Sequence, residues 1–312
     1  MMLKKIQIGK LVLTVNASDS LQRKLNYFYS DIKENGIDSK ICITINCCKK
    51  LPELDDIDNL TPIHMKNIVY FYKKDKCIYI ARNEIASGII NMCSESCTWW
   101  VLETAYNVRS IFHTCILDPV SLIGVNYGVI VLHASLIECN NKGIIFIGKS
   151  GMGKSTVSML VSQNSEDIFK QADDTVQIDC QTNNIRVIPL FTGEGYIESV
   201  ADKYLSEDWN MLPNVRGAGK IYYFPAMQQV ELPLSEIIIL EKTGQDNTFE
   251  LLNKGNALTE IVKYQTHISG PYLLKWFECI RILTLNVLIF KKKYKDVCNI
   301  DEITKKICTT NM

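Results

Sequence analysis

A glycine-rich segment is the part of the sequence whose residue types and spacing predict chemistry most clearly. Residues Gly148 to Ser155 satisfy the spacing G-x-x-x-x-G-K-[ST], directly after the apolar run Ile144–Ile147 and before a helical pattern. Glycines let the backbone turn so that successive N–H groups point at phosphate oxygens, and the N-terminus of the following helix adds partial positive charge. The segment therefore predicts a binding site for nucleotide phosphates.

Two side chains of this segment have separate expected roles. The Lys154 ammonium is expected to reach the β- and γ-phosphates, and the Ser155 hydroxyl is expected to bind Mg²⁺. The residues expected to contact the nucleotide are Gly148, Lys149, Ser150, Gly151, Met152, Gly153, Lys154, Ser155 and Thr156.

Two adjacent carboxylates, Asp173 and Asp174, open a strand predicted at Thr175–Ile178. Neighbouring side chains at the start of a strand point to opposite sides, so one could serve a metal ion while the other faces an acceptor. An isolated Asp-Asp pair is more often part of a solvated turn. Its place right after the helix of the glycine-rich loop favours the functional interpretation.

A histidine, His133, lies in the apolar strand predicted over Val129–Glu138, before the glycine-rich loop. A histidine among apolar residues is more often a hydrogen-bonded core residue than a functional one. By itself, His133 therefore predicts no activity.

In this order, the three motifs resemble a known family. His133-Ala134-Ser135, the glycine-rich loop and Ala172-Asp173-Asp174 look like the catalytic domain of HPr kinase/phosphorylase and its kinase relatives, which share a P-loop fold with phosphoenolpyruvate carboxykinase. The resemblance covers about Gly128–Cys308. It implies an enzyme that uses ATP and Mg²⁺.

The resemblance also implies a role for each matched side chain. Lys154 would contact the β- and γ-phosphates, and Ser155 would bind Mg²⁺. Asp174 would take the proton from an acceptor hydroxyl. His133 would lie near the phosphates, and Asp173 would support the metal or the acceptor.

The sequence departs from the HPr-specific enzymes at one stretch. Their Glu-Ile-Arg-Gly segment has no clear counterpart, and Glu194 or Glu198 is a weak substitute for its metal-binding glutamate. The sequence therefore gives no support for phosphorylase activity or for HPr itself as a substrate. Arg216 and Lys220 lie in a glycine-flanked segment that is either a mobile basic clamp on the transferring phosphate or an exposed loop with incidental charges.

The function expected from these motifs is an ATP-dependent kinase that phosphorylates a serine hydroxyl on a small protein or peptide, such as a ribosomally made peptide. Two alternatives stay open. The acceptor could be the hydroxyl of a small molecule, or the protein could hold ATP as a regulatory ligand without transferring phosphate.

The elements that position these residues indicate an α/β fold with two units. Residues 1–125 are expected to form a small α/β unit that is the candidate for acceptor binding. Residues 126–312 are expected to form a P-loop catalytic domain with a mixed sheet, of the type found in HPr kinase and phosphoenolpyruvate carboxykinase. By analogy with the family, the chain could be a homo-oligomer.

Hydrophobic periodicity predicts the elements of both units. A long helix is expected to end where Pro119 stops it, and the lysine run 291–295 is expected to be a solvated edge or turn. In the first unit we predict strands at Ile6–Val15, Cys42–Ile45 and within Thr61–Ala81, and helices at Leu21–Ile32 and Trp99–Asp118. In the second we predict strands at Val129–Glu138, Ile144–Ile147, Thr175–Ile178, Ile185–Leu190, Ile237–Leu240 and Ile282–Phe290, helices at Lys154–Val161, Ala257–Tyr264 and Ile300–Cys308, and turns at Asn140–Gly143 and Asn183–Asn184.

Composition gives no support for some classes of partner. Lys+Arg and Asp+Glu both number 34, so no overall basic field draws the chain to nucleic acid. The longest apolar stretches fall short of the roughly 18–20 residues that cross a bilayer, and no signal-peptide pattern is visible, so we expect no membrane partner and a cytoplasmic location. The 12 cysteines are expected to be reduced and mostly buried.

Overall fold

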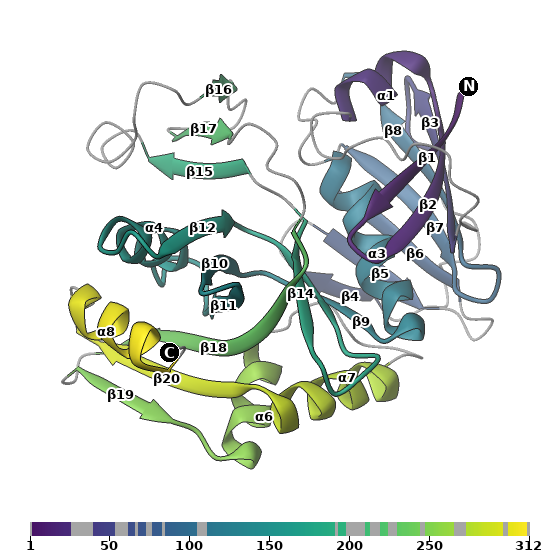
Figure 1. Ribbon diagram of the computed structural model, residues 1–312. Coiled ribbons are helices and arrows are strands. Elements are labelled where there is room, and N and C mark those ends of the chain that lie inside the picture. Colours follow the sequence, from purple (N-terminus) through teal and green to yellow (C-terminus); the bar gives the residue numbers. More distant parts are fainter. Residues whose placement is uncertain are drawn as a thin grey trace. The chain divides into compact units, whose positions relative to one another are not determined.

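The computed structural model has an α/β fold with mixed sheets (Figure 1). It describes residues 2–25, 40–53, 62–65, 68–72, 77–82, 85–104, 111–190, 193–197, 210–212, 219–223, 230–243, 247–264, 273–295 and 299–310. The chain divides into two compact units. The first takes in the described residues of Met1–Tyr127 and Ser269–Leu273, and the second takes in those of Gly128–Ile268 and Leu274–Met312.

The first unit is built on an eight-stranded sheet with the order β1-β2-β3-β8-β7-β6-β5-β4. Strands β2, β3 and β8 run parallel to one another, and the other neighbours are antiparallel. The elements are β1 (Met2–Ile8), β2 (Leu11–Ala17), α1 (Asp19–Leu25), β3 (Ile41–Cys48), β4 (Pro62–Met65), β5 (Ile68–Tyr72), β6 (Cys77–Arg82), β7 (Ala86–Asn91) and β8 (Ser96–Leu102).

The single strand predicted over Ile6–Val15 is wrong. The chain turns at Gly9, whose φ is +58°, so that β1 and β2 form an antiparallel hairpin. Both strands are rich in apolar residues, which hides the turn in the hydrophobicity pattern. The helix predicted over Leu21–Ile32 begins at Asp19 as α1, and its residues after Leu25 lie outside the described part of the chain.

The helix predicted over Trp99–Asp118 is wrong at its start and correct at its end, where residues 111–118 are helical. Its first residues lie in β8, where buried and half-buried side chains alternate as a strand requires. Helical structure precedes and continues through Pro119, as the π-helix η1 (His113–Leu117), α3 (Asp118–Ile123) and the 3₁₀-helix η2 (Gly124–Tyr127). Pro119 lies in the first turn of α3, where its missing N–H costs no hydrogen bond, so it does not stop the helix.

The second unit contains a nine-stranded sheet in which β18 pairs with β11, β14 and β20. The main path has the order β12-β10-β11-β18-β14-β13-β9, and β19 pairs with β20. Its strands are β9 (Val129–Leu132), β10 (Ser135–Cys139), β11 (Lys142–Ile147), β12 (Ile168–Ala172), β13 (Val176–Asp179), β14 (Arg186–Pro189), β18 (Leu232–Lys242), β19 (Thr248–Leu251) and β20 (Leu288–Tyr294). The unit also holds a three-stranded sheet of β15 (Gly193–Ile197), β16 (Asn210–Leu212) and β17 (Gly219–Tyr223), and the helices α4 (Lys154–Gln163), α6 (Lys254–Tyr264), α7 (Leu273–Asn286) and α8 (Ile300–Thr310).

The strand predicted over Val129–Glu138 is two strands. β9 ends at Leu132 and pairs with β13, whereas β10 begins at Ser135 and pairs with β11 and β12. The turn predicted at Asn140–Gly143 is confirmed: Asn140 and Asn141 both have positive φ (52° and 59°), the conformation that the tight turns of β-hairpins require.

The apolar run Ile282–Phe290 is not a strand but the end of α7 followed by the start of β20. The lysine run after it is not a solvated edge, because Lys291 and Lys292 are buried inside the sheet. Carboxylates from neighbouring elements compensate both charges. Lys292 Nζ lies 2.5 Å from Glu302 Oε2, and Lys291 Nζ lies 3.2 Å from Glu260 Oε1.

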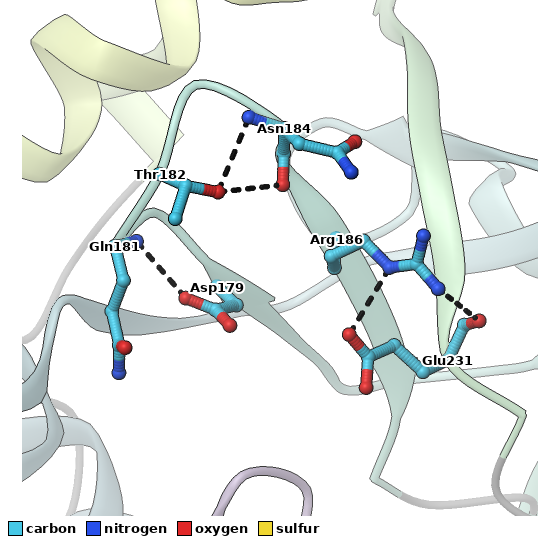
Figure 2. A network of polar contacts seen from close by, with 6 residues as sticks. All are labelled: Asp179, Gln181, Thr182, Asn184, Arg186 and Glu231. Atoms are coloured by element: carbon cyan, nitrogen blue, oxygen red, sulfur yellow. Dashed lines mark hydrogen bonds and ion pairs between the residues drawn. The ribbon is translucent and has the colours of Figure 1, made fainter.

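The connection between β13 and β14 is held by polar contacts within a few residues (Figure 2). The N–H of Gln181 donates to Asp179 Oδ1 at 2.9 Å, and the N–H of Asn184 donates to Thr182 Oγ1 at 3.3 Å. Arg186 Nε donates to Glu231 Oε1 at 3.1 Å, which ties β14 to the residue before β18. The turn predicted at Asn183–Asn184 is therefore present.

Eleven cysteines lie in the described part of the chain, and none of these eleven forms a disulfide. Only five are fully buried, so the prediction that most are buried is wrong. Cys42 is exposed because it points to the face of β3 opposite the buried Ile41, Ile43 and Ile45, and Cys47 is exposed near the end of the strand. The buried ones are Cys97, Cys115, Cys139, Cys180 and Cys279.

Candidate functional site

The glycine-rich segment forms a loop between β11 and α4. At Gly148, an added Cβ would lie 2.6 Å from the Leu240 carbonyl oxygen of β18, so the backbone passes too close to its neighbour for any side chain. Gly153 precedes α4 and has a φ of +70°, which favours glycine. These two glycines allow the loop to leave the sheet and enter the helix.

Residues from β20 and β18 hold the loop at Met152. The Tyr294 hydroxyl on β20 donates to the Met152 carbonyl at 2.7 Å, and the N–H of Lys242 lies 3.2 Å from the Met152 sulfur. The N–H of Met152 donates to the Lys149 carbonyl at 3.1 Å, which closes a turn inside the loop. The loop is therefore fixed by the sheet below it as well as by its own backbone.

Lys154 begins α4, and its side chain is buried against the loop. Its Nζ donates to the carbonyls of Gly148 at 3.0 Å and Lys149 at 3.4 Å. Burial lowers the pKa of the Lys154 ammonium, and the carboxylates of Asp173 and Asp174 oppose this effect. The ammonium of Lys154 is therefore within electrostatic range of both aspartates.

The pairing of four strands explains why distant motifs meet there. β9 pairs with β13, with Leu132 opposite Val176, while β10 pairs with β12, with Leu136 opposite Ala172. The short connection between β9 and β10 must therefore run beside the connection between β12 and β13. The first connection carries His133, and the second carries both aspartates.

Asp173 is the buried member of the acidic pair. Its Oδ1 accepts a hydrogen bond from Ser135 Oγ at 2.5 Å, and both side chains are excluded from solvent. Ser135 is the first residue of β10 and lies opposite Phe146, two residues before Gly148. The serine thus links the acidic pair to the strand that leads into the loop.

Asp174 occupies an unfavourable turn. Its φ is +75°, and the N–H of Thr175 donates to the Asp173 carbonyl at 3.0 Å, so that Asp174 is the central residue of a tight γ-turn. Non-glycine residues rarely adopt this conformation, and it is found mostly where a functional geometry is enforced by the surroundings. The N–H of Ala134 donates to the Asp174 carbonyl at 3.2 Å and helps to hold the turn.

His133 faces Asp174 and is not a core residue. Its Nδ1 lies 2.9 Å from Asp174 Oδ1 and 2.6 Å from the Asp174 carbonyl oxygen. The His133 side chain is 53% exposed and that of Asp174 is 19% exposed. The His133–Asp174 pair can therefore be reached from solvent, whereas Asp173 lies below it.

Sequence reasoning gave no role to Ser135, Tyr294 or Lys170. Lys170 lies on β12, a strand that was not predicted, and its buried Nζ donates to the Ser155 carbonyl at 3.2 Å. Ser135 belongs to the histidine motif, so its position in that motif was the available signal. Nothing in the local sequence marks Tyr294 or Lys170.

Two residues of the weaker predictions, Glu194 and Lys220, belong to the three-stranded sheet. The backbone of Glu194 lies in β15, opposite Tyr222, and that of Lys220 lies in β17, opposite Tyr196. Glu198 and Arg216 lie outside the described residues.

The oxygen donors near the loop are more suitable for Mg²⁺, which takes several of its ligands from phosphates and waters, than for a metal ion whose ligands all come from the protein. Within the described ranges, no group of three or more His, Cys, Asp or Glu side chains could hold a metal ion. Mg²⁺ is ordinarily bound by one or two protein oxygens together with phosphates and waters. The Ser155 hydroxyl and the second carboxylate oxygen of Asp173 fit that pattern.

Among the described residues, no helix combines the length and the apolar character that crossing a membrane requires.

Comparison of the chain with protein-family models gave no match, and comparison with curated proteins gave none either.

Proposed function

We propose that the second unit binds ATP with Mg²⁺ and transfers the γ-phosphoryl group to a hydroxyl, with a serine of a small protein or peptide as the expected acceptor. The observation that carries this proposal is the convergence of Lys154, Asp173, Asp174 and His133 on one site from three separate connections of the sheet. The proposed fold of this unit is the P-loop kinase type that the motif order resembles.

The loop and Lys154 would bind the phosphates. Backbone N–H groups at the start of α4 and the buried ammonium of Lys154 supply positive charge where the β- and γ-phosphates would lie. Phosphoryl transfer requires little covalent chemistry from the protein, so positioning and charge neutralisation supply most of the catalysis. Ser155 and Asp173 would hold Mg²⁺, which when bound neutralises charge on the phosphates.

Asp174 is the proposed general base. As the acceptor oxygen bonds to the γ-phosphorus, its proton passes to the Asp174 carboxylate, and the bond from the γ-phosphorus to the β–γ bridging oxygen breaks to release ADP. His133, 2.9 Å from Asp174 Oδ1, would hold this carboxylate in place. The partial exposure of Asp174 supports its access to an acceptor.

The first unit is the proposed site of acceptor recognition. Its eight-stranded sheet has a separate core and carries none of the residues assigned here to phosphate chemistry. A protein or peptide acceptor needs a binding surface outside the nucleotide site, which a separate unit can supply.

The proposal is tested by following label from γ-labelled ATP after incubation of the purified chain with Mg²⁺ and a cytosolic extract. We expect label on a protein or peptide, lost in Lys154→Ala and in Asp174→Asn. Lys142→Ala is the matched control, because Lys142 lies at the opposite end of β11 from the loop. Label only on a small metabolite would show that the acceptor is a small molecule and not a protein or peptide. ATP binding without any transfer would replace the kinase by a nucleotide-responsive regulator.

A further inference from the structure

We propose that Ser135 is a positioning residue that holds the Asp173 carboxylate for the Mg²⁺–nucleotide complex. The inference rests on the proposed function and deepens it, because it names the group that makes Asp173 a competent metal ligand. Ser135 itself is not proposed to touch the nucleotide or the metal.

The hydrogen bond between the two side chains has a defined direction. An ionised carboxylate can only accept, so the single proton of the Ser135 hydroxyl is donated to Asp173 Oδ1, at 2.5 Å. Bonds of this kind to a charged acceptor are short and stronger than neutral ones. Because both side chains are excluded from solvent, water cannot easily replace the serine as donor.

The backbone around Ser135 makes this donor rigid. Ser135 is paired with Phe146 of β11, and the next residue, Leu136, is paired with Ala172 of β12. Ser135 is therefore fixed in the sheet between the strand that leads into the loop and the strand that leads into the aspartates. A donor on such a frame fixes Oδ1 and leaves Oδ2 of Asp173 to face a ligand.

Loss of the Ser135 hydroxyl should weaken the binding of Mg²⁺ more than the binding of ATP. The phosphate contacts proposed for Lys154 and the loop backbone do not involve Ser135. Removal of a group that orients a metal ligand typically costs 10–100-fold in metal affinity or activity. Mg²⁺ is expected to raise the ATP affinity of the wild type above its value in EDTA. We expect Ser135→Ala to make this increase about tenfold smaller, and to leave the ATP affinity in EDTA unchanged.

The experiment measures the ATP dissociation constant by calorimetry, in Mg²⁺ and in EDTA, for the wild type, Ser135→Ala, Ser135→Thr and Asp173→Asn. Ser135→Thr keeps the hydroxyl and should retain most of the gain from Mg²⁺, whereas Asp173→Asn should lose it. Ser235→Ala is the matched control, because the Ser235 hydroxyl donates to the Gly143 carbonyl at the far end of β11. Thermal unfolding checks the fold of each variant, and Ser135→Cys replaces any Ser135 variant that does not fold.

The outcomes separate the two proposals. If Mg²⁺ strengthens ATP binding in the wild type and Asp173→Asn abolishes that gain while Ser135→Ala keeps all of it, the inference about Ser135 is wrong and the proposed function stands. If the wild type does not bind ATP, or if its ATP affinity equals that of Lys154→Ala, the proposed function is wrong. The proposed role of Ser135 is then wrong as well.

Discussion

At the scale of single residues, the candidate base occupies the least favourable backbone conformation of the site. Asp174 has a φ of +75° in a γ-turn, held by the N–H groups of Ala134 and Thr175 and by the contact with His133. The turn places the Asp174 carboxylate beside His133 while Asp173 turns toward Ser135. The two adjacent carboxylates thus acquire different surroundings, as a division of roles between metal and acceptor requires.

This conformation predicts a difference in stability between two variants that remove the Asp174 carboxylate. Asp174→Gly and Asp174→Ala both delete the carboxylate, so they differ mainly in how the new residue tolerates the positive φ. A Cβ is penalised there by about 1–2 kcal/mol, part of which is offset by the greater freedom of glycine in the unfolded chain. Urea unfolding should show Asp174→Gly to be more stable than Asp174→Ala by about 1 kcal/mol. Equal stability would contradict the γ-turn.

At the scale of elements, the site depends on strands that lie outside the motifs. β20 supplies Tyr294, whose hydroxyl bonds to the Met152 carbonyl, and β12 supplies Lys170 beneath the first turn of α4. Tyr294 is 142 residues from Met152 in the sequence, and Lys170 is 15 residues from Ser155. The loop conformation is therefore a property of the assembled sheet and not of the glycine-rich segment alone.

Tyr294→Phe tests this dependence. The change keeps the ring but removes the donor to Met152, at a cost of about 1 kcal/mol, the usual net worth of one hydrogen bond. We expect ATP binding, measured by calorimetry, to weaken by about fivefold, because 1.4 kcal/mol corresponds to a factor of ten. Tyr79→Phe, a change in the sheet of the first unit, serves as the control and should leave ATP affinity unaltered. The same affinity for both variants would show that β20 does not support the loop.

A second prediction at this scale concerns α6 and β20. Burial alone would raise the pKa of Glu260, but hydrogen bonds from Lys263 and Lys291 outweigh it and hold the pKa below its usual value. A carboxyl whose pKa is lower in the folded chain than in the unfolded chain stabilises the folded state. This stabilisation is complete at pH values above the unfolded pKa, about 4.3, and is lost as the pH falls through the folded pKa.

We therefore expect Glu260→Gln to lower the free energy of unfolding by about 1–2 kcal/mol at pH 7, because it removes the charge of one of the two carboxylates, Glu260 and Glu241, that lie beside the buried Lys291 ammonium. The difference from the wild type should begin to shrink as the pH falls below the unfolded pKa of about 4.3, and should vanish below the folded pKa, where the wild-type carboxyl is protonated as well. Urea unfolding between pH 7 and acid measures both effects. Glu278→Gln, which breaks an exposed pair with Arg281, should change little, and a constant difference at all pH values would contradict the assignment to Glu260.

At the scale of the whole molecule, the features predicted well from the sequence are those set by local backbone demands. The loop glycines, the start of α4 at Lys154 and the hairpin turn at Asn140 and Asn141 follow from conformations that few residues adopt. The α/β class follows from the same alternation of strands and helices. These signals are short-range, so the residues themselves carry them.

The features that were missed depend on pairing over long sequence distances. No local pattern separates β9 from β10, because apolar residues continue across the break at His133, and only pairing with β13 and β12 divides them. The contact of Ser135 with Asp173 joins the start of β10 to the connection between β12 and β13.

The central claim is that the loop between β11 and α4 binds nucleotide phosphates, and the most direct test is calorimetric titration of the intact chain with ATP in Mg²⁺. The account predicts saturable binding to the wild type, at least about tenfold weaker binding to Lys154→Ala, since a charge-assisted contact contributes about 1.5–3 kcal/mol, and wild-type binding to Lys142→Ala. Equal binding to the wild type and Lys154→Ala, or no binding to the wild type, would contradict it.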